Sequence, residues 1–280
     1  MPNAISASEL TTYRWSFEQD VQCASELGFD GIAVWRQKLS DFGEEKGAEL
    51  LVESDLAATS LMWAGGFTGN EGRSFRESVE DAIDAIQTAS LLKAPNLIVY
   101  SGSRAGHTNR HAMRLVQTAL SELADVAGEY GVCLALKPVH PQWARDCTFL
   151  TDLDSTVELI HSVGSEWLRL ALDTYQWSGD EEIFQRLPEF IPLTSIIQVA
   201  DAGSIEMWEP NRLLPGLGQL PIAAFLGKAI EAGYNGSFEI ELWGEDVEAW
   251  DYDELLRQSY QSLHAMLSNA GKVENRLRTP

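Results

Sequence analysis

Two periodicities of hydrophobic and polar residues alternate along this chain. Short apolar runs such as Leu-Arg-Leu-Ala-Leu at 168–172 are typical of strands buried on both faces. Longer segments between them repeat apolar residues every three or four positions, and at 75–92 the acidic residues fall away from that apolar face. Gly28, Gly131 and Gly233 each follow such a segment, where glycine supplies the left-handed residue that ends a helix. The pattern therefore predicts alternating helices and strands.

The predicted elements amount to eight strand–helix units. Eight units in 280 residues take about 35 residues each, the size expected in a (β/α)8 barrel. A doubly wound open sheet is the alternative, but residues 5–16 lack the glycine-rich turn that would follow its first strand. We expect one (β/α)8 barrel domain over residues 1–270 and a polar tail over 271–280. Strands are predicted at 4–10, 32–35, 57–63, 96–101, 132–138, 168–174, 195–200 and 237–242, and helices at 17–27, 44–55, 75–92, 109–130, 153–163, 181–187, 222–232 and 252–270.

The strongly acidic composition argues against nucleic acids and anionic membranes as binding partners. The net charge of −22 lacks the basic footprint that nucleic acids and anionic membranes require, so neither is expected as a partner. Cys23, Cys133 and Cys147 have no spacing typical of metal or disulfide sites, which favours a reducing compartment. No apolar run reaches the roughly 18 residues of a membrane helix, and the first residues do not resemble a signal peptide. We expect a cytoplasmic protein, and the sequence leaves homo-oligomer formation open.

One predicted strand ends in a charge. Lys137 closes an alternating apolar run and is followed by Pro138. Burying an ammonium group costs several kcal/mol unless it is paired. Asp173 closes another apolar strand, while Glu239 and Glu241 alternate with apolar residues and so point to one side, the barrel interior. We expect Asp173 and Glu241 to lie beside Lys137; a purely structural ion-pair network is the alternative.

Polar and aromatic residues gather at the predicted strand ends, where barrels of this type place their chemistry. Tryptophan rings suit the apolar faces of a sugar, although packing at the barrel mouth is the simpler explanation. Arginines in the same loops suit a phosphate or carboxylate, although most loop arginines are solvated or paired with surface acids. The predicted substrate-binding residues are Trp35, Trp63, His107, His140, Arg145, Gln176, Arg212 and Trp243.

The order of these motifs resembles the sugar phosphate isomerase/epimerase family with the xylose isomerase-like TIM barrel, which includes tagatose and psicose 3-epimerases and inosose dehydratases. The likeness covers nearly the whole chain, with GFDGI at 28–32, PGLG at 215–218 and GYNG at 233–236. It implies a protein that acts on a small carbohydrate at the C-terminal mouth of the barrel. It also implies a divalent metal, Mn, Mg, Co or Zn, held by two Glu, one Asp and one His.

The chain departs from this ligand set. Lys137 stands where the family has a Glu, Gln198 stands where it has the metal-binding His, and Gln176 replaces a substrate-side His. Asp173, Gln198 and Glu241 remain as metal ligands if a metal binds, Gln198 through its amide oxygen. An ammonium group repels even a unit charge by about 4 kcal/mol at about 4 Å and an effective dielectric of about 20. We therefore expect weak metal binding or none.

Two functions follow from this altered site. In the first, the protein is an isomerase, epimerase or related lyase in which Lys137 replaces the metal, with Lys137, Asp173 and Glu241 as catalytic residues. Lys137 would polarise a sugar carbonyl or stabilise an enediolate, and Glu241 would act as base. A single base suits aldose–ketose isomerisation or elimination, and His107 or His140 is the candidate for a second proton-transfer group.

In the second, the protein is a non-catalytic carbohydrate-binding relative with the same fold. DNA-repair endonucleases share this barrel, but they need a His-rich zinc site and a basic face, which five His and a charge of −22 argue against.

Overall fold

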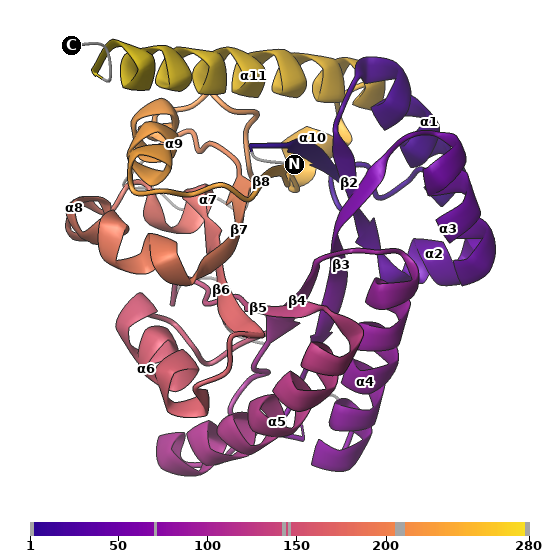
Figure 1. The fold of residues 1–280 in the computed structure, drawn as a ribbon, viewed down its shortest axis with the longest axis vertical. Helices are drawn as coiled ribbons and strands as arrows, with labels where there is room; N and C mark the ends of the chain where they lie inside the picture. Colours follow the sequence, from indigo (N-terminus) through magenta and orange to yellow (C-terminus); the bar gives the residue numbers. More distant parts are fainter. Residues whose placement is uncertain (1–2, 70–71, 142–143, 145–146, 205–210, 278–280) are drawn as a thin grey trace. The chain divides into compact units, whose positions relative to one another are not determined.

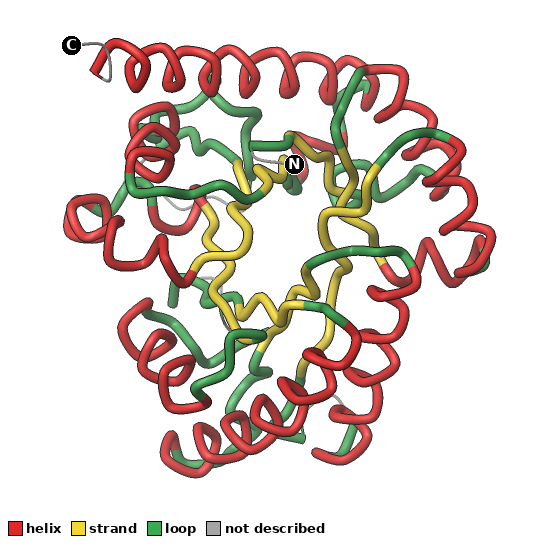
Figure 2. The backbone as a smooth tube through the Cα atoms, viewed as in Figure 1, coloured by secondary structure: helices red, strands yellow, loops and turns green. Residues whose placement is uncertain are grey.

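The computed structural model describes residues 3–69, 72–141, 144, 147–204 and 211–277. Across these residues, eight strands follow one another in the order β1 to β8 and form a closed barrel, with helices between them (Figures 1 and 2). The (β/α)8 fold predicted from the pattern is therefore confirmed. The chain divides into two compact units, Met1–Ala33 with Leu50–Ala57 and Leu172–Pro280, and Val34–Glu49 with Ala58–Ala171.

The first unit holds the strands β7, β8 and β1 and the start of β2, which pair in parallel. In this sheet Gln198 of β7 is in register with Glu239 of β8, which is in turn in register with Ser6 of β1. Helices α9 and α11 lie side by side on its outside (Figure 1). The elements are β1 (Ile5–Ser8), α1 (Phe17–Leu27), β2 (Gly31–Trp35), α7 (Thr174–Trp177), α8 (Glu181–Phe190), the 3-10 helix Ile191–Leu193, β7 (Thr194–Val199), α9 (Ile222–Glu231), β8 (Ser237–Ile240), α10 (Glu245–Glu248) and α11 (Tyr252–Leu277).

The second unit holds β3 to β6, which also pair in parallel. The register of β4 with β5 sets Val99 against Leu136, so Tyr100 and Lys137 follow at the ends of neighbouring strands. A β-bulge between Met62 and Ala64 interrupts the pairing of β3 near its end. The elements are α2 (Arg36–Phe42), α3 (Glu44–Glu53), β3 (Ala57–Gly65), α4 (Phe75–Leu91), β4 (Asn96–Tyr100), α5 (Asn109–Tyr130), β5 (Cys133–Leu136), α6 (Leu153–Val163) and β6 (Leu168–Asp173). The end of α3 from Leu50, the first residue of β3, and Leu172 and Asp173 of β6 belong to the first unit.

Local sequence signals explain the helix ends. Ser16 and Ser74 begin α1 and α4 with complete capping boxes, in which serine and the residue three positions later satisfy each other's backbone N–H groups. Gly131 ends α5 with φ of 68°, a conformation that costs a side chain-bearing residue about 1 kcal/mol or more. These signals are short-range, so the sequence alone located the helices well.

The structure differs from the predicted elements mainly at strand ends. Short helices α2, α7 and α10 follow β2, β6 and β8, where the pattern predicted no helix, and the strand predicted at 168–174 ends one residue earlier because Thr174 begins α7. Four to seven residues are too few to show a 3.6-residue period, which explains the omission. Helix α11 continues to Leu277 and so includes residues 271–277, which the sequence placed in the polar tail.

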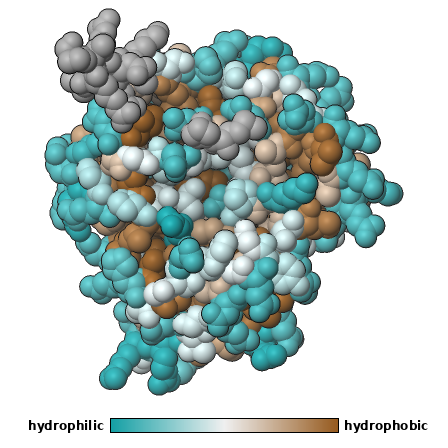
Figure 3. Space-filling view, in the orientation of Figure 1, coloured by the Kyte–Doolittle hydropathy of each residue, from teal (hydrophilic) through white to brown (hydrophobic). Residues whose placement is uncertain are grey.

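The surface is rich in hydrophilic residues (Figure 3). Hydrophilic residues cover much of the face shown in Figure 3, as 42 Asp and Glu in 280 residues would suggest. None of the described helices is both long and apolar enough to cross a membrane.

Candidate functional site

Three acidic side chains lie buried at the strand ends of the first unit. Asp173 ends β6, Glu239 lies in β8 and Glu241 follows it, and none is more than 2% exposed. The two-residue period of a strand puts both glutamates on one side, as predicted. Because Gln198 is in register with Glu239, its side chain belongs to the same cluster. The structure therefore brings together the predicted residues Asp173, Gln198 and Glu241.

Gln198 links the two glutamates. Its Nε2 donates to Oε1 of Glu239 at 2.7 Å and to Oε2 of Glu241 at 2.6 Å. Carboxylates cannot donate, so this orientation of the amide follows from its partners. The Oε1 of Gln198 is buried and accepts no hydrogen bond from any described residue. A buried acceptor without a donor costs about 1–3 kcal/mol, so Gln198 is the one member of this cluster that carries such a cost on its oxygen.

Arg212 links Asp173 to Glu241. Its side chain is 1% exposed, and its Nη2 lies 2.7 Å from Oδ2 of Asp173. Its Nη1 lies 3.4 Å from Oε1 of Glu241 and donates to the backbone oxygen of the same residue at 3.1 Å. The sequence placed Arg212 in a loop as a ligand for a phosphate or carboxylate. The structure instead pairs it with carboxylates of the protein, and a direct role in substrate binding stays a prediction.

Two aromatic rings hold the guanidinium group in place. The Cζ of Arg212 lies 4.8 Å from the ring centroid of Tyr175 and 4.7 Å from that of Trp243. The backbone N–H of Arg212 donates to the backbone oxygen of Trp243 at 3.0 Å. Buried cation–π contacts of this kind are worth about 2 kcal/mol or more. Arg212 is thus a fixed group rather than a mobile arm.

Asp201 organises the loop that carries Arg212. Its Oδ1 accepts from the backbone N–H groups of Ala202 and Leu220, at 2.8 and 2.9 Å. Its Oδ2 accepts from those of Gly216 and Gly218, at 2.9 and 3.0 Å. The backbones of Asp201 and Leu213 also exchange hydrogen bonds of 2.8 and 2.9 Å, directly beside Arg212. Sequence analysis did not select Asp201 as a site residue, although an acid close behind Gln198 and ahead of the Pro-Gly-Leu-Gly motif was an available signal.

Lys137 lies in the second unit and is 2% exposed, as the strand pattern predicted. Its Nζ lies 6.0 Å from the ring centroid of Tyr100. The ring of Tyr100 in turn meets Trp63 edge to face, with centroids 6.4 Å apart. Trp63 is 45% exposed, an unusual fraction for a large ring at a strand end. The expected pairing of Lys137 with Asp173 and Glu241 stays a prediction.

A cluster of charged side chains fixes the end of β3 that carries Trp63. Arg36 donates to the backbone oxygen of Trp63 at 3.2 Å and forms two hydrogen bonds to Asp81, at 3.0 and 3.1 Å. Arg73 also pairs with Asp81, at 3.1 Å. Burial raises the pKa of Asp81, but the hydrogen bonds and charges of Arg36 and Arg73 outweigh it and hold that pKa below its ordinary value. Trp63 is therefore anchored through its backbone while its ring stays exposed.

The remaining predicted residues have varied environments. Trp35 and His140 are half-buried, and Gln176 is buried in α7 of the first unit. His107 is half-buried, and its Nε2 lies 3.1 Å from the backbone oxygen of Thr68. Arg145 lies outside the described residues, as do the strand-end tryptophans Trp143 and Trp208. Within the described part of the chain, no group of three or more His, Cys, Asp or Glu side chains is arranged to hold a metal ion.

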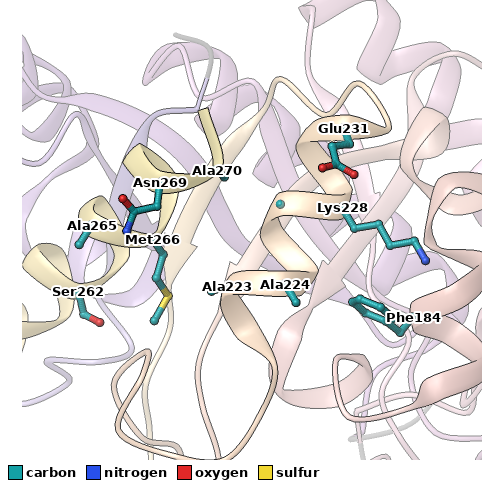
Figure 4. Close-up of a pocket in the computed structure, with 11 residues that line it drawn as sticks. Phe184, Ala223, Ala224, Lys228, Glu231, Ser262, Ala265, Met266, Asn269 and Ala270 are labelled. Atoms are coloured by element: carbon teal, nitrogen blue, oxygen red, sulfur yellow. The ribbon is translucent and has the colours of Figure 1, made fainter. Parts of the chain in front are cut away.

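A groove of about 700 Å³ lies on the outside of the first unit, between α8, α9 and α11 (Figure 4). Small and apolar side chains line it, including Ala223 and Ala224 on α9 and Met266 on α11. Lys228 at its edge is placed over the Phe184 ring, 4.5 Å from the centroid. None of the predicted site residues lines this groove, so the strand ends remain the candidate site.

The closed barrel of eight parallel strands, with three buried acids at the strand ends, defines a (β/α)8 barrel protein with a polar site at the C-terminal ends of its strands. The model of the family described as xylose isomerase-like TIM barrel matches residues 21–266, and the chain belongs to this family.

Its relatives include proteins of known activity. It is 23% identical to an inosose isomerase of Bacillus velezensis over 276 residues, which covers 93% of this chain and 96% of that protein. It is 25% identical to the fructoselysine 3-epimerase of Shigella flexneri, covering 82% and 86% of the two chains. Among solved structures, the IOLI protein with a bound zinc atom superimposes with a TM-score of 0.83 at 19% identity, covering 95% of this chain and 99% of that one.

Proposed function

We propose that this protein is a sugar isomerase or epimerase that moves a proton beside the carbonyl group of a small carbohydrate, with the family's metal site altered by Lys137 and Gln198. Family membership and the names of its relatives support the substrate class. The observation that carries the proposal is the buried cluster of Asp173, Glu239 and Glu241 held by Gln198 and Arg212.

The chemistry needs a base and a positive group. Isomerisation and epimerisation of such sugars both begin when a base removes the proton from a carbon next to the carbonyl group, which leaves an enediolate. A carboxylate such as Glu241 can take that proton and return it to another carbon or to the other face. A fixed cation stabilises the negative oxygen of the enediolate, because it needs no reorganisation as the charge develops. We assign the base to Glu241 and the fixed cation in the first unit to Arg212.

Two further features support a carbohydrate ligand. The Oε1 of Gln198 is a buried acceptor to which no described residue donates, and a sugar hydroxyl group would satisfy it if the neighbouring side chains moved to admit one. The exposed ring of Trp63, fixed through its backbone by Arg36, suits the apolar face of a sugar. Lys137, buried beside the Tyr100 ring, stays the predicted second positive group.

A non-catalytic carbohydrate-binding protein is the second candidate. It is favoured by the number of bonds that already engage the carboxylates, since Glu241 contacts both Gln198 and Arg212. A base in such a network has to give up part of its hydrogen bonding to accept a proton. The same contacts that preorganise a catalytic site would also stabilise a site that only binds.

Solvent deuterium exchange separates the two candidates. The protein is incubated in D2O with inososes, ketoses and fructoselysine, and NMR detects deuterium on the carbon beside the carbonyl group. We expect exchange with at least one sugar, and a loss of about a hundredfold or more in Glu241→Gln. Glu254→Gln on the exposed face of α11 is the matched control and should exchange like wild type. Binding of a sugar without any exchange would establish the non-catalytic candidate instead.

A further inference from the structure

We propose that the guanidinium group of Arg212 is the resident cation of the Asp173–Glu241 site and excludes the divalent metal that the family resemblance implies. This deepens the proposed function and rests on it for the identity of the site. Its test, however, is metal binding, which succeeds or fails independently of turnover. Sequence analysis gave the place of the cation to Lys137, whereas the contacts within the first unit point to Arg212.

The first argument is that Arg212 pairs with the two carboxylates that would bind the metal. Asp173 and Glu241 are the two family metal ligands that this chain retains in kind, and Arg212 contacts both, at 2.7 and 3.4 Å. A metal bound to these carboxylates would lie within a few ångströms of the guanidinium. Repulsion between a dication and a guanidinium about 4 Å apart lowers metal affinity by at least about three decades at an effective dielectric of about 20.

The second argument is the orientation of Gln198. A metal ligand has to present an acceptor atom, and the amide oxygen is the only such atom in this side chain. The nitrogen, however, faces Glu241, at 2.6 Å from its Oε2. The amide therefore supplies a hydrogen-bond donor on the side where a shared metal would need a ligand. The residues present thus suit a guanidinium-centred site and do not fit the family's metal.

The third argument is that the Arg212 side chain is held firmly in the site. The Cζ of its guanidinium lies 4.8 and 4.7 Å from the ring centroids of Tyr175 and Trp243, and the side chain is 1% exposed. Its backbone N–H is bonded to Trp243, and the next residue pairs with Asp201. Displacement of the side chain by a metal would break both ion pairs and both ring contacts, while the backbone bonds would keep the residue close to the site. Because an arginine side chain stays protonated at any workable pH, the charge of the site depends neither on metal supply nor on chelators.

Manganese titration tests the inference on the full-length protein. Free Mn²⁺ is measured by electron paramagnetic resonance in wild type, Asp173→Asn and Arg212→Met, with Arg257→Met on α11 as a matched surface control. We expect the wild type to bind only weakly, and equally to Asp173→Asn, because the net charge of −22 collects cations at its surface. Arg212→Met should gain about a thousandfold or more in affinity, and the added change Asp173→Asn should remove that gain. Arg257→Met should titrate like wild type.

Two results would overturn the inference. One is tight binding of one Mn²⁺ or Zn²⁺ per wild-type chain that disappears in Asp173→Asn. The other is a folded Arg212→Met, checked by circular dichroism, that gains no affinity. If Arg212→Met does not fold, the wild-type and Asp173→Asn titrations decide the question by themselves. Bound metal together with deuterium exchange would refute only this inference, whereas absence of both would refute only the proposed function.

Discussion

The Asp201 carboxylate fixes the backbone of the loop that carries Arg212, and a substitution there should cost stability. It accepts four backbone N–H groups, two on each oxygen, and is fully buried. In Asp201→Asn, the amide oxygen can serve only one of these pairs, and the NH2 group then faces the other pair, whichever way the amide turns. Each lost hydrogen bond to a charged group is worth about 1.5–3 kcal/mol, so two of them predict a loss of about 3–6 kcal/mol.

A loss of this size is measurable by urea unfolding, because domains of this kind unfold with a free energy of about 5–15 kcal/mol. Asp152→Asn is the matched control. Asp152 accepts from the backbone N–H of Ser155 at 2.7 Å as the N-cap of α6, a position where Asn serves as well as Asp. We expect its free energy of unfolding to stay within about 0.5 kcal/mol of wild type.

The effect should also reach Arg212, because the backbone pairing of Asp201 with Leu213 fixes the residue beside it. Deuterium exchange should therefore fall in folded Asp201→Asn and stay at the wild-type rate in Asp152→Asn. If the free energy of unfolding of Asp201→Asn lies within about 1 kcal/mol of wild type, the four hydrogen bonds do not carry the energy assigned to them here.

Three further predictions concern stability and reactivity. Gly218→Ala should destabilise the protein by about 1–3 kcal/mol, because the new Cβ would overlap the backbone oxygen of Ala202. Gly227→Ala in α9 should instead stabilise the protein by about 0.5–1 kcal/mol, because nothing lies within 4 Å of the new Cβ. Thermal unfolding measures both changes. Burial raises the pKa of Asp81, but its bonds with Arg36 outweigh burial and lower that pKa, so Asp81→Asn should cost up to about 1 kcal/mol of unfolding free energy at pH 7. The stability difference between wild type and Asp81→Asn should vanish as pH falls through the folded-state pKa of Asp81. Urea unfolding at several pH values measures this difference. Burial raises the pKa of Cys23 to about 12, so iodoacetamide at pH 8 should modify it at least about a hundredfold more slowly than in the urea-unfolded chain, as read by mass spectrometry.

The sequence predicted the fold because its signals are local. Apolar strands, capping boxes and glycine stops each depend on a few neighbouring residues, and they located the eight strands of the barrel. The same signals placed Asp173, Glu239 and Glu241 at strand ends with their side chains inward. Lys137 is buried for the same reason, since a strand position fixes the direction of its side chain.

The partner of the acids could not be predicted in this way. Arg212 lies beyond the end of β7 in a segment without periodicity, so nothing in the pattern fixed the direction of its side chain. Its position depends on the pairing of Leu213 with Asp201 and on its own bond to Trp243, which are contacts between separate segments. A loop arginine is exposed more often than not, and the sequence offered no reason to expect burial.

Gln198 and Arg212 both bring hydrogen-bond donors to the buried carboxylates. A metal centre needs several acceptor atoms that converge without donors among them, and the Glu and His that the family resemblance implies would supply such acceptors. Here Gln198 offers an N–H to Glu241, and Arg212 adds N–H groups between Glu241 and Asp173, so donors and acceptors satisfy one another within the protein. A cluster with its own donors gains little from a metal and loses hydrogen bonds by binding one. If the inference about Arg212 holds, tight metal binding should require both Arg212→Met and Gln198→His, and each change alone should bind Mn²⁺ more weakly than the pair.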